Sequence, residues 1–179
     1  MNDPILLTSF TTWKPEQTSN SSDDLMDDVI ARYPYRDSLC IQRKLPVDFQ
    51  FAPRQAIAAI RNRQPGAILC CGMGERYTSL NVESTAVNGD RVLHTSVDLS
   101  ALTAGLTITE ISHDAGRFVC NQLYYDVLNY LQLNGIDSPC IFVHVPVLTP
   151  VNQEAIATDF LILLDRMRSL IRRPANAVA

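Results

Sequence analysis

Two kinds of apolar pattern alternate along the chain. Continuous apolar runs between turn residues are typical of strands buried on both faces of a sheet. Other segments repeat apolar residues at helical spacing, which is typical of one buried helix face. The pattern predicts strands within 4–10, 38–47, 66–74, 107–112 and 139–148, an irregular strand within 77–88, and helices within 25–33, 53–64, 100–106, 116–133 and 152–173.

Strands that alternate with helices predict a mostly parallel sheet covered by helices on both faces, a three-layer α/β/α sandwich of the α/β class. The first long helix is expected to begin at a capping Asp23 or Asp24, and the second at Pro53. No repeat or linker divides the 179 residues, so we expect a single domain over 1–179.

Charge and composition narrow the classes of function. The net charge of −4 and the pI of 5.3 argue against nucleic acid, whose phosphates require a basic face. No apolar run reaches the roughly 20 residues of a membrane helix, and Asp3 stands where a signal peptide carries positive charge. Five cysteines without CxxC spacing suggest free thiols in a cytoplasmic protein. The pattern shows no metal-binding spacing.

Cys120 is the most informative of these thiols. It opens the apolar face of the helix predicted over 116–133, which continues through Leu123, Tyr124, Val127, Leu128 and Leu131. A cysteine at that place has two interpretations. It is either a small core residue, as free cysteines commonly are, or a thiol that the positive end of the helix helps to ionise.

His144 and Glu83 are the matching candidates. His144 lies in the last predicted strand, and Glu83 lies in the segment after the strand at 66–74. An imidazole beside Cys120 would take the thiol proton and later return it to a leaving amine, and a carboxylate would hold the imidazole in the required tautomer. Spacing alone does not show that the three residues meet. Taken singly, His144 is also consistent with a core histidine and Glu83 with a surface charge.

Three segments carry a resemblance to a known family. The run SHDAGRFVCNQLYYDVLNYL resembles the signature of pyroglutamyl peptidase type I, in which Ser-x-x-Ala-Gly-x-x-Val-Cys-Asn leads into a helix. FVHVP is similar to that family's Phe-Ile-His-Val-Pro strand, and VESTAVN to its Pro-Glu-Arg-x-Ala-x-Asn segment. The blocks occur in the family's order, and the similarity extends over about four fifths of the chain.

The resemblance implies a cysteine omega-peptidase that removes an N-terminal pyroglutamate from a small peptide or amide. Cys120 would be the nucleophile, His144 the base, and Glu83 the residue that orients it. It further implies an α/β/α sandwich, no metal or organic cofactor, a cytoplasmic location, and a homo-oligomer, either a dimer or a tetramer.

The chain departs from the family in the segments that would determine specificity. SFTTWKP replaces a glycine-rich segment, so Phe10 and Trp13 would be the two aromatics that flank a flat lactam ring. Met73 stands in a shortened turn where a small or amide residue is usual. Arg91 matches a family arginine only if a short deletion is allowed. A long polar loop that covers the site in the family is reduced here to residues 89–106.

Three functions therefore remain open from the sequence. The first is cleavage of pyroglutamyl amides. The second is an intact triad whose altered loops select another small amide. The third is an inactive pyroglutamyl-peptidase-like scaffold, in which Cys120 would react no faster than a free cysteine.

Overall fold

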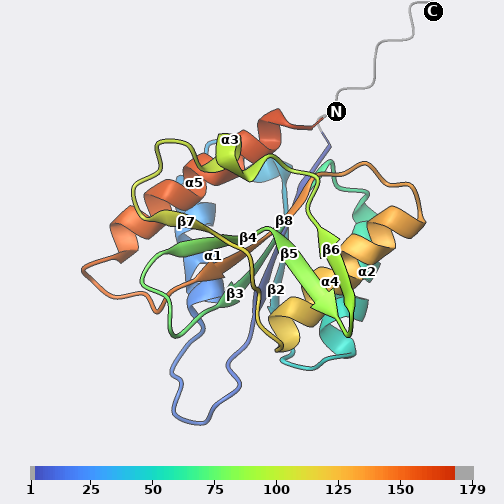
Figure 1. Ribbon diagram of the computed structural model, residues 1–179. Helices are drawn as coiled ribbons and strands as arrows, with labels where there is room; N and C mark the ends of the chain where they lie inside the picture. Colours follow the sequence, from blue (N-terminus) through green and yellow to red (C-terminus); the bar gives the residue numbers. More distant parts are fainter. Residues whose placement is uncertain (1–2, 172–179) are drawn as a thin grey trace, which may run out of the picture.

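The computed structural model describes residues 3–171 and has a six-stranded sheet at its centre (Figure 1). The strand order is β2-β1-β3-β8-β4-β7. The bounds are β1 Ile5–Phe10, β2 Leu39–Leu45, β3 Ala67–Met73, β4 Leu80–Glu83, β7 Thr109–Ser112 and β8 Cys140–Val145. β1, β2, β3 and β8 are mutually parallel, whereas β4 pairs antiparallel with β8 and parallel with β7. The predicted α/β fold with a mostly parallel, mixed sheet is confirmed.

Helices cover both faces of the sheet, and each face has its own apolar core (Figure 1). One core contains side chains of α1 (Ser21–Arg32), α3 (Leu99–Thr103) and α5 (Gln153–Ser169). The other contains side chains of α2 (Phe51–Arg63) and α4 (Val119–Leu133). β1, β3 and β8 lie between the two cores, which explains why their sequences are almost continuously apolar.

The segment after β4 forms a hairpin that the sequence pattern did not reveal. β5 (Thr85–Asn88) and β6 (Arg91–His94) pair antiparallel around Gly89, whose φ is +57°. The hairpin packs against α4, where the Asn121 side chain accepts from Val87 N–H (2.8 Å) and donates to Val87 C=O (2.8 Å). A short 3₁₀ turn at Arg36–Ser38 precedes β2.

Several predicted helix boundaries were wrong, and tertiary bonds explain the first one. Asn20, and not Asp23 or Asp24, caps α1, since its side chain accepts from Ser22 N–H. Asp23 instead accepts from Ser9 Oγ (2.7 Å) and from Arg43 Nε (2.9 Å). The Asp23 carboxylate thus bonds side chains of β1 and β2 and does not cap its own helix.

The other boundaries differ by a few residues. α2 begins at Phe51, two residues before Pro53, because Asp48 accepts from the N–H groups of Gln50 and Phe51 (2.8 Å each). α4 begins at Val119 and not near 116, since Gly116 has a φ of +79°. The last helix begins at Gln153 and ends at Ser169, and the part predicted over 172–173 lies outside the described residues. None of the helices within 3–171 combines the length and the apolar character that spanning a membrane requires.

Asp159 fixes the chain that enters β7. It is buried in the middle of α5, and its carboxylate accepts from the N–H groups of Thr107 (2.9 Å) and Ile108 (2.7 Å) and from Thr109 Oγ1 (2.9 Å). These bonds satisfy backbone donors that the sheet does not use, and they place β7 beside β4.

We predict that Asp159→Ala lowers the free energy of unfolding by about 2–4 kcal/mol, because it leaves these donors without an acceptor. Asp165→Ala is the matched control on the exposed side of α5 and should change stability by less than about 0.5 kcal/mol. Urea denaturation of the two variants measures the difference. Equal stabilities would show that the carboxylate contributes nothing to the anchoring of β7.

Candidate active site

Cys120 is the second residue of α4, where the helix offers both a dipole and free donors. Phe118 occupies the N-cap position and has an extended backbone but no capping side-chain bond. The N–H groups of the first turn therefore have no intrahelical acceptor. Such a helix start favours negative charge on a nearby thiolate or oxygen. Cys120 and Cys40 are half-buried, whereas Cys70, Cys71 and Cys140 are buried.

The Cys120 sulfur rests directly on Gly72 of β3. A Cβ atom built on Gly72 would lie 2.6 Å from Sγ and 2.9 Å from Phe142 Cζ, so no side chain fits at this position. Gly72 is also the register partner of His144 on the adjacent strand β8. Register partners in parallel strands are less than about 5 Å apart and share a face of the sheet, so this glycine brings the sulfur beside the imidazole.

His144 is bonded at one nitrogen to Glu83 and faces Cys120 at the other. Its Nδ1 lies 2.7 Å from Glu83 Oε1, and the ring is 6% exposed. Burial alone would lower the pKa of His144. The hydrogen bonds to Cys120 and then to Glu83 together have the larger effect in the opposite direction, so the pKa is raised to about 9. The imidazole thus favours its protonated form at neutral pH.

Glu83 reaches His144 because β4 runs antiparallel to its neighbour β8. Glu83 pairs with Phe142, two residues before His144, and its side chain extends along β8 toward the imidazole. The residue is fully buried, and Tyr124 Oη donates to its backbone carbonyl (3.1 Å). The carboxyl end of β4 therefore points the opposite way to that of β8.

A small recess adjoins the Cys120 side chain. It is lined by three of the residues predicted to bind substrate, Phe10, Trp13 and Met73. Its remaining lining residues are Asn20, Val47, Phe118, Val119 and Cys120 itself. The Trp13 and Phe118 ring centroids are 6.2 Å apart at an angle of 50°. An aromatic wall of this kind suits a flat, apolar group.

Polar side-chain contacts hold the loop that carries Trp13. The glycines that the family has in this segment could not make such contacts. Glu75 pairs with Lys14 and accepts from Gln17 Nε2 (2.9 Å), while Gln17 Oε1 accepts from the N–H of Trp13 (2.9 Å). Hydrogen bonding to Lys14 and then to Gln17 lowers the pKa of Glu75. These contacts join the 11–20 loop to the turn after β3.

Arg91 lies elsewhere. It is the first residue of β6, paired with Asn88, with an exposed side chain that does not line the recess. Its predicted role in substrate binding stays a prediction. The sequence analysis missed four lining residues, Asn20, Val47, Phe118 and Val119. Phe118 and Val119 directly precede Cys120 and could have been found from that position.

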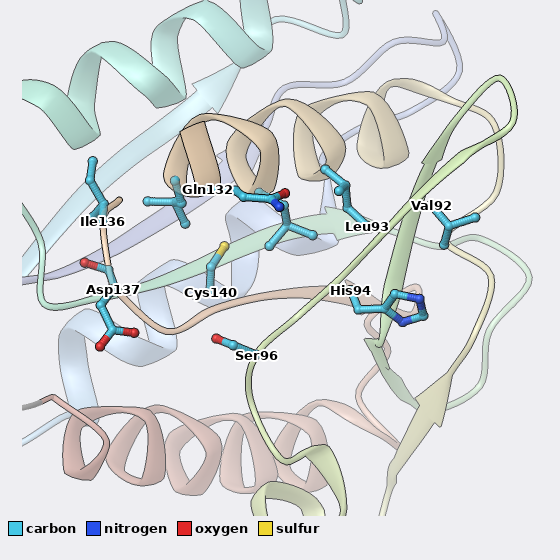
Figure 2. A pocket seen from close by; sticks show the side chains of 11 residues that line it. Val92, Leu93, His94, Ser96, Gln132, Ile136, Asp137 and Cys140 are labelled. Carbon is cyan, nitrogen blue, oxygen red and sulfur yellow. The ribbon is translucent and has the colours of Figure 1, made fainter. Parts of the chain in front are cut away.

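A larger hollow lies between β6 and the C-terminal half of α4 (Figure 2). Figure 2 shows His94, Gln132 and Cys140 around it, and none of the predicted site residues line it. Cys140 is only 1% exposed, and its bond to Cys70 together with burial raises the pKa of its thiol well above the ordinary value. The hollow therefore lacks an ionised nucleophile. Within residues 3–171 no group of three His, Cys, Asp or Glu side chains is arranged to hold a metal ion.

Three comparisons relate this chain to known proteins. A family described as pyroglutamyl peptidase matches residues 96–160. The pyrrolidone-carboxylate peptidase of Thermoanaerobacter sp. (strain X514) is 31% identical over 135 residues, which are 60% of this chain and 66% of that protein. The chain thus spans about two thirds of that relative's length. The enzyme of the same name from Vibrio vulnificus (strain YJ016) is 28% identical over 170 residues, 80% of this chain and 78% of that protein.

Solved structures show the same fold. Pyroglutamyl peptidase I from Bacillus amyloliquefaciens superposes with a TM-score of 0.81 at 17% identity, covering 99% of this chain and all of that one. Pyrrolidone carboxyl peptidase from Thermococcus litoralis superposes with a TM-score of 0.77, also at 17% identity, over 97% of this chain. The sequence matches, this fold and the Cys120 helix start agree with one another, and the chain belongs to the pyroglutamyl peptidase family.

Proposed function

We propose that this protein is a cysteine omega-peptidase that hydrolyses the amide bond after an N-terminal pyroglutamate. The observation that carries the proposal is the buried Glu83–His144 pair, which faces a cysteine at the start of α4. The names of the relatives support the choice of substrate. A single domain over 1–179, a dimer or tetramer, and a cytoplasmic location stay predictions.

The reaction begins with the Cys120 thiolate and the His144 imidazolium. Sulfur attacks the acyl carbonyl carbon, and the carbonyl oxygen becomes an oxyanion that first-turn N–H groups of α4 can receive. His144 Nε2 then gives its proton to the departing amine as the C–N bond breaks, which leaves a thioester on Cys120. Water attacks the thioester, His144 takes the proton from this water, and the acid leaves as the thiolate re-forms. Glu83 keeps Nδ1 protonated throughout.

The lining of the recess favours a second candidate, a triad hydrolase for another small acyl group. Asn20 is the only amide side chain in the recess, and its Oδ1 and Nδ2 already bond Ser22 N–H (3.0 Å) and the Thr11 carbonyl (3.0 Å). A lactam would have to find its polar partners in the backbone, whereas an apolar ring would need none. A panel of acyl amides that compete for Cys120 alkylation separates the two candidates.

The first prediction concerns the nucleophile. Purified protein should release the fluorophore from pyroglutamyl-7-amino-4-methylcoumarin, and Cys120→Ser should lower kcat/KM by at least about 10³-fold, since a serine hydroxyl is not ionised by this site. Cys40→Ser, a half-buried thiol on β2, is the matched control and should retain activity. Wild-type protein that releases no fluorophore at high concentration would count against the pyroglutamyl substrate.

The second prediction concerns pH. The pKa of His144 is raised to about 9, so the thiolate–imidazolium pair should persist at neutral pH and be lost as pH rises through about 9. The alkaline limb of kcat/KM should therefore lie near pH 9, reported as an apparent value of the coupled pair. Glu83→Gln should shift this limb to lower pH, because the neutral amide no longer stabilises the imidazolium. An alkaline limb near 6.5 that Glu83→Gln does not move would contradict the proposed pair.

The third prediction concerns the place of the sulfur. Gly72→Ala should lower kcat/KM by about 100-fold, because the new methyl group pushes Sγ away from His144. Cys71 precedes Gly72 on β3 and faces the other side of the sheet. Cys71→Ala should therefore lower stability but leave kcat unchanged. Thermal melts of both variants distinguish a displaced sulfur from an unfolded chain. Full activity in Gly72→Ala would mean that the close contact is not needed.

A further inference from the structure

The His144 imidazole is held by more contacts than its bond to Glu83. The Phe142 ring lies against it with centroids 4.9 Å apart, and the Tyr77 ring with centroids 5.4 Å apart at an angle of 44°. Phe142 belongs to the sheet two residues earlier on β8, so its position is fixed by the fold. Tyr77 comes from a turn, and its position needs a separate explanation.

The turn after β3 is built to place Tyr77. Gly74 N–H donates to the Val145 carbonyl (2.8 Å), and Tyr77 N–H donates to the Gly74 carbonyl (3.0 Å). The Tyr77 ring packs closely against Gly74, since a Cβ atom on Gly74 would fall 2.2 Å from Cδ2 of the ring. The shortened glycine turn thus provides the space in which the aromatic side chain approaches His144.

The far end of the ring lies beside Glu83. The Tyr77 hydroxyl is close enough to Ser112 for that side chain to lower its pKa, and Ser112 is the register partner of Glu83 on β7. Burial and the nearby Glu83 carboxylate raise the pKa of Tyr77, so the phenol stays neutral. Tyr77 therefore spans from the imidazole to the end of β7.

Tyr77 also lies between the imidazole and solvent. His144 is 6% exposed, whereas Tyr77 is half-buried and the residues on either side of it, Arg76 and Thr78, are exposed. The long polar loop that covers the site in the family is shortened in this sequence to residues 89–106. The Tyr77 ring covers the histidine in its place.

We propose that Tyr77 is a positioning residue: its ring keeps the His144 imidazole on Glu83 and turned toward Cys120, and shields this pair from water. The inference rests on the proposed hydrolase chemistry, but not on which acyl group is cleaved. The ring, and not the hydroxyl, carries the role, because the ring is the part that contacts the imidazole.

The test compares Tyr77→Ala, Tyr77→Leu and Tyr77→Phe. Turnover of the pyroglutamyl fluorogenic amide should fall at least about tenfold in kcat for the Ala and Leu variants, with KM changed less than about threefold, because the acyl recess does not include Tyr77. Tyr77→Phe and Ser112→Ala, which keep the ring, should retain more than half of wild-type kcat. Tyr35→Ala, a half-exposed tyrosine that packs on Tyr33 and Arg168, is the matched control and should be unchanged.

A second measurement follows iodoacetamide alkylation of Cys120 against pH and needs no substrate. Wild-type protein should react rapidly well below the pH range of a free thiol, whereas in Tyr77→Ala and Tyr77→Leu the rate should rise only near pH 8–9. A variant that merely loses stability would lower the reactive fraction and leave the profile in place. Unshifted profiles and unchanged kcat in folded Tyr77→Leu would overturn the inference.

The two proposals fail separately. If wild-type protein splits no pyroglutamyl amide but its alkylation profile shifts in Tyr77→Leu, the positioning role stands and the substrate is wrong. If wild-type protein is active and Tyr77→Leu is equal to it in both measurements, the hydrolase stands and Tyr77 has no positioning role.

Discussion

The structure depends on one buried interaction, the hydrogen bond between Glu83 Oε1 and His144 Nδ1. A fully buried carboxylate costs several kcal/mol unless a donor and an opposite charge compensate it. The imidazole supplies both, and the carboxylate in turn is one of the groups that raise the histidine's pKa. Neither residue would be a favourable core residue alone. Their pairing explains why the adjacent strands β4 and β8 carry Glu83 and His144 on the face covered by α4.

The direction of β4 follows from the same constraint. A parallel strand at this place would present its carboxyl-end residue above His144, whereas the antiparallel β4 brings Glu83 level with Phe142 and within reach of the imidazole. β7 runs with β4, and Asp159 of α5 holds its entry. A helix on one face of the sheet thus supports the edge of the site on the other face.

The sequence predicted the fold class and the strands of the central sheet because long apolar runs have few alternatives to burial. Cys120, His144 and Glu83 could be proposed from their segments, and the resemblance to a family brought them together; spacing alone did not. The antiparallel β4 and the hairpin that follows could not be seen, since short alternating segments do not specify their partners. The N-cap was misassigned because Asp23 is as good a cap as Asn20 by propensity, and its bond to Arg43 decides between them.

Tyr77 shows a different limit. Its approach to His144 depends on the space above Gly74 and on Ser112, which is 35 positions further along the chain, so local pattern carries no sign of it. An aromatic residue in a glycine turn directly after a buried strand is the only sequence signal, and loops are where such functional contacts concentrate. The polar tie between Lys14, Gln17 and Glu75 is equally non-local, and it fixes the loop that carries Trp13.

The protonation state of His144 in the resting protein tests the central interaction most directly. NMR of the imidazole in ¹³C,¹⁵N-labelled protein, followed from pH 5 to 10 in wild type and in Cys120→Ala, would report it. The buried pair predicts a doubly protonated ring at pH 7.5 that titrates near 9 in wild type and at lower pH without the sulfur. A neutral imidazole at pH 7.5, with a titration that Cys120→Ala does not change, would contradict a thiolate held beside His144.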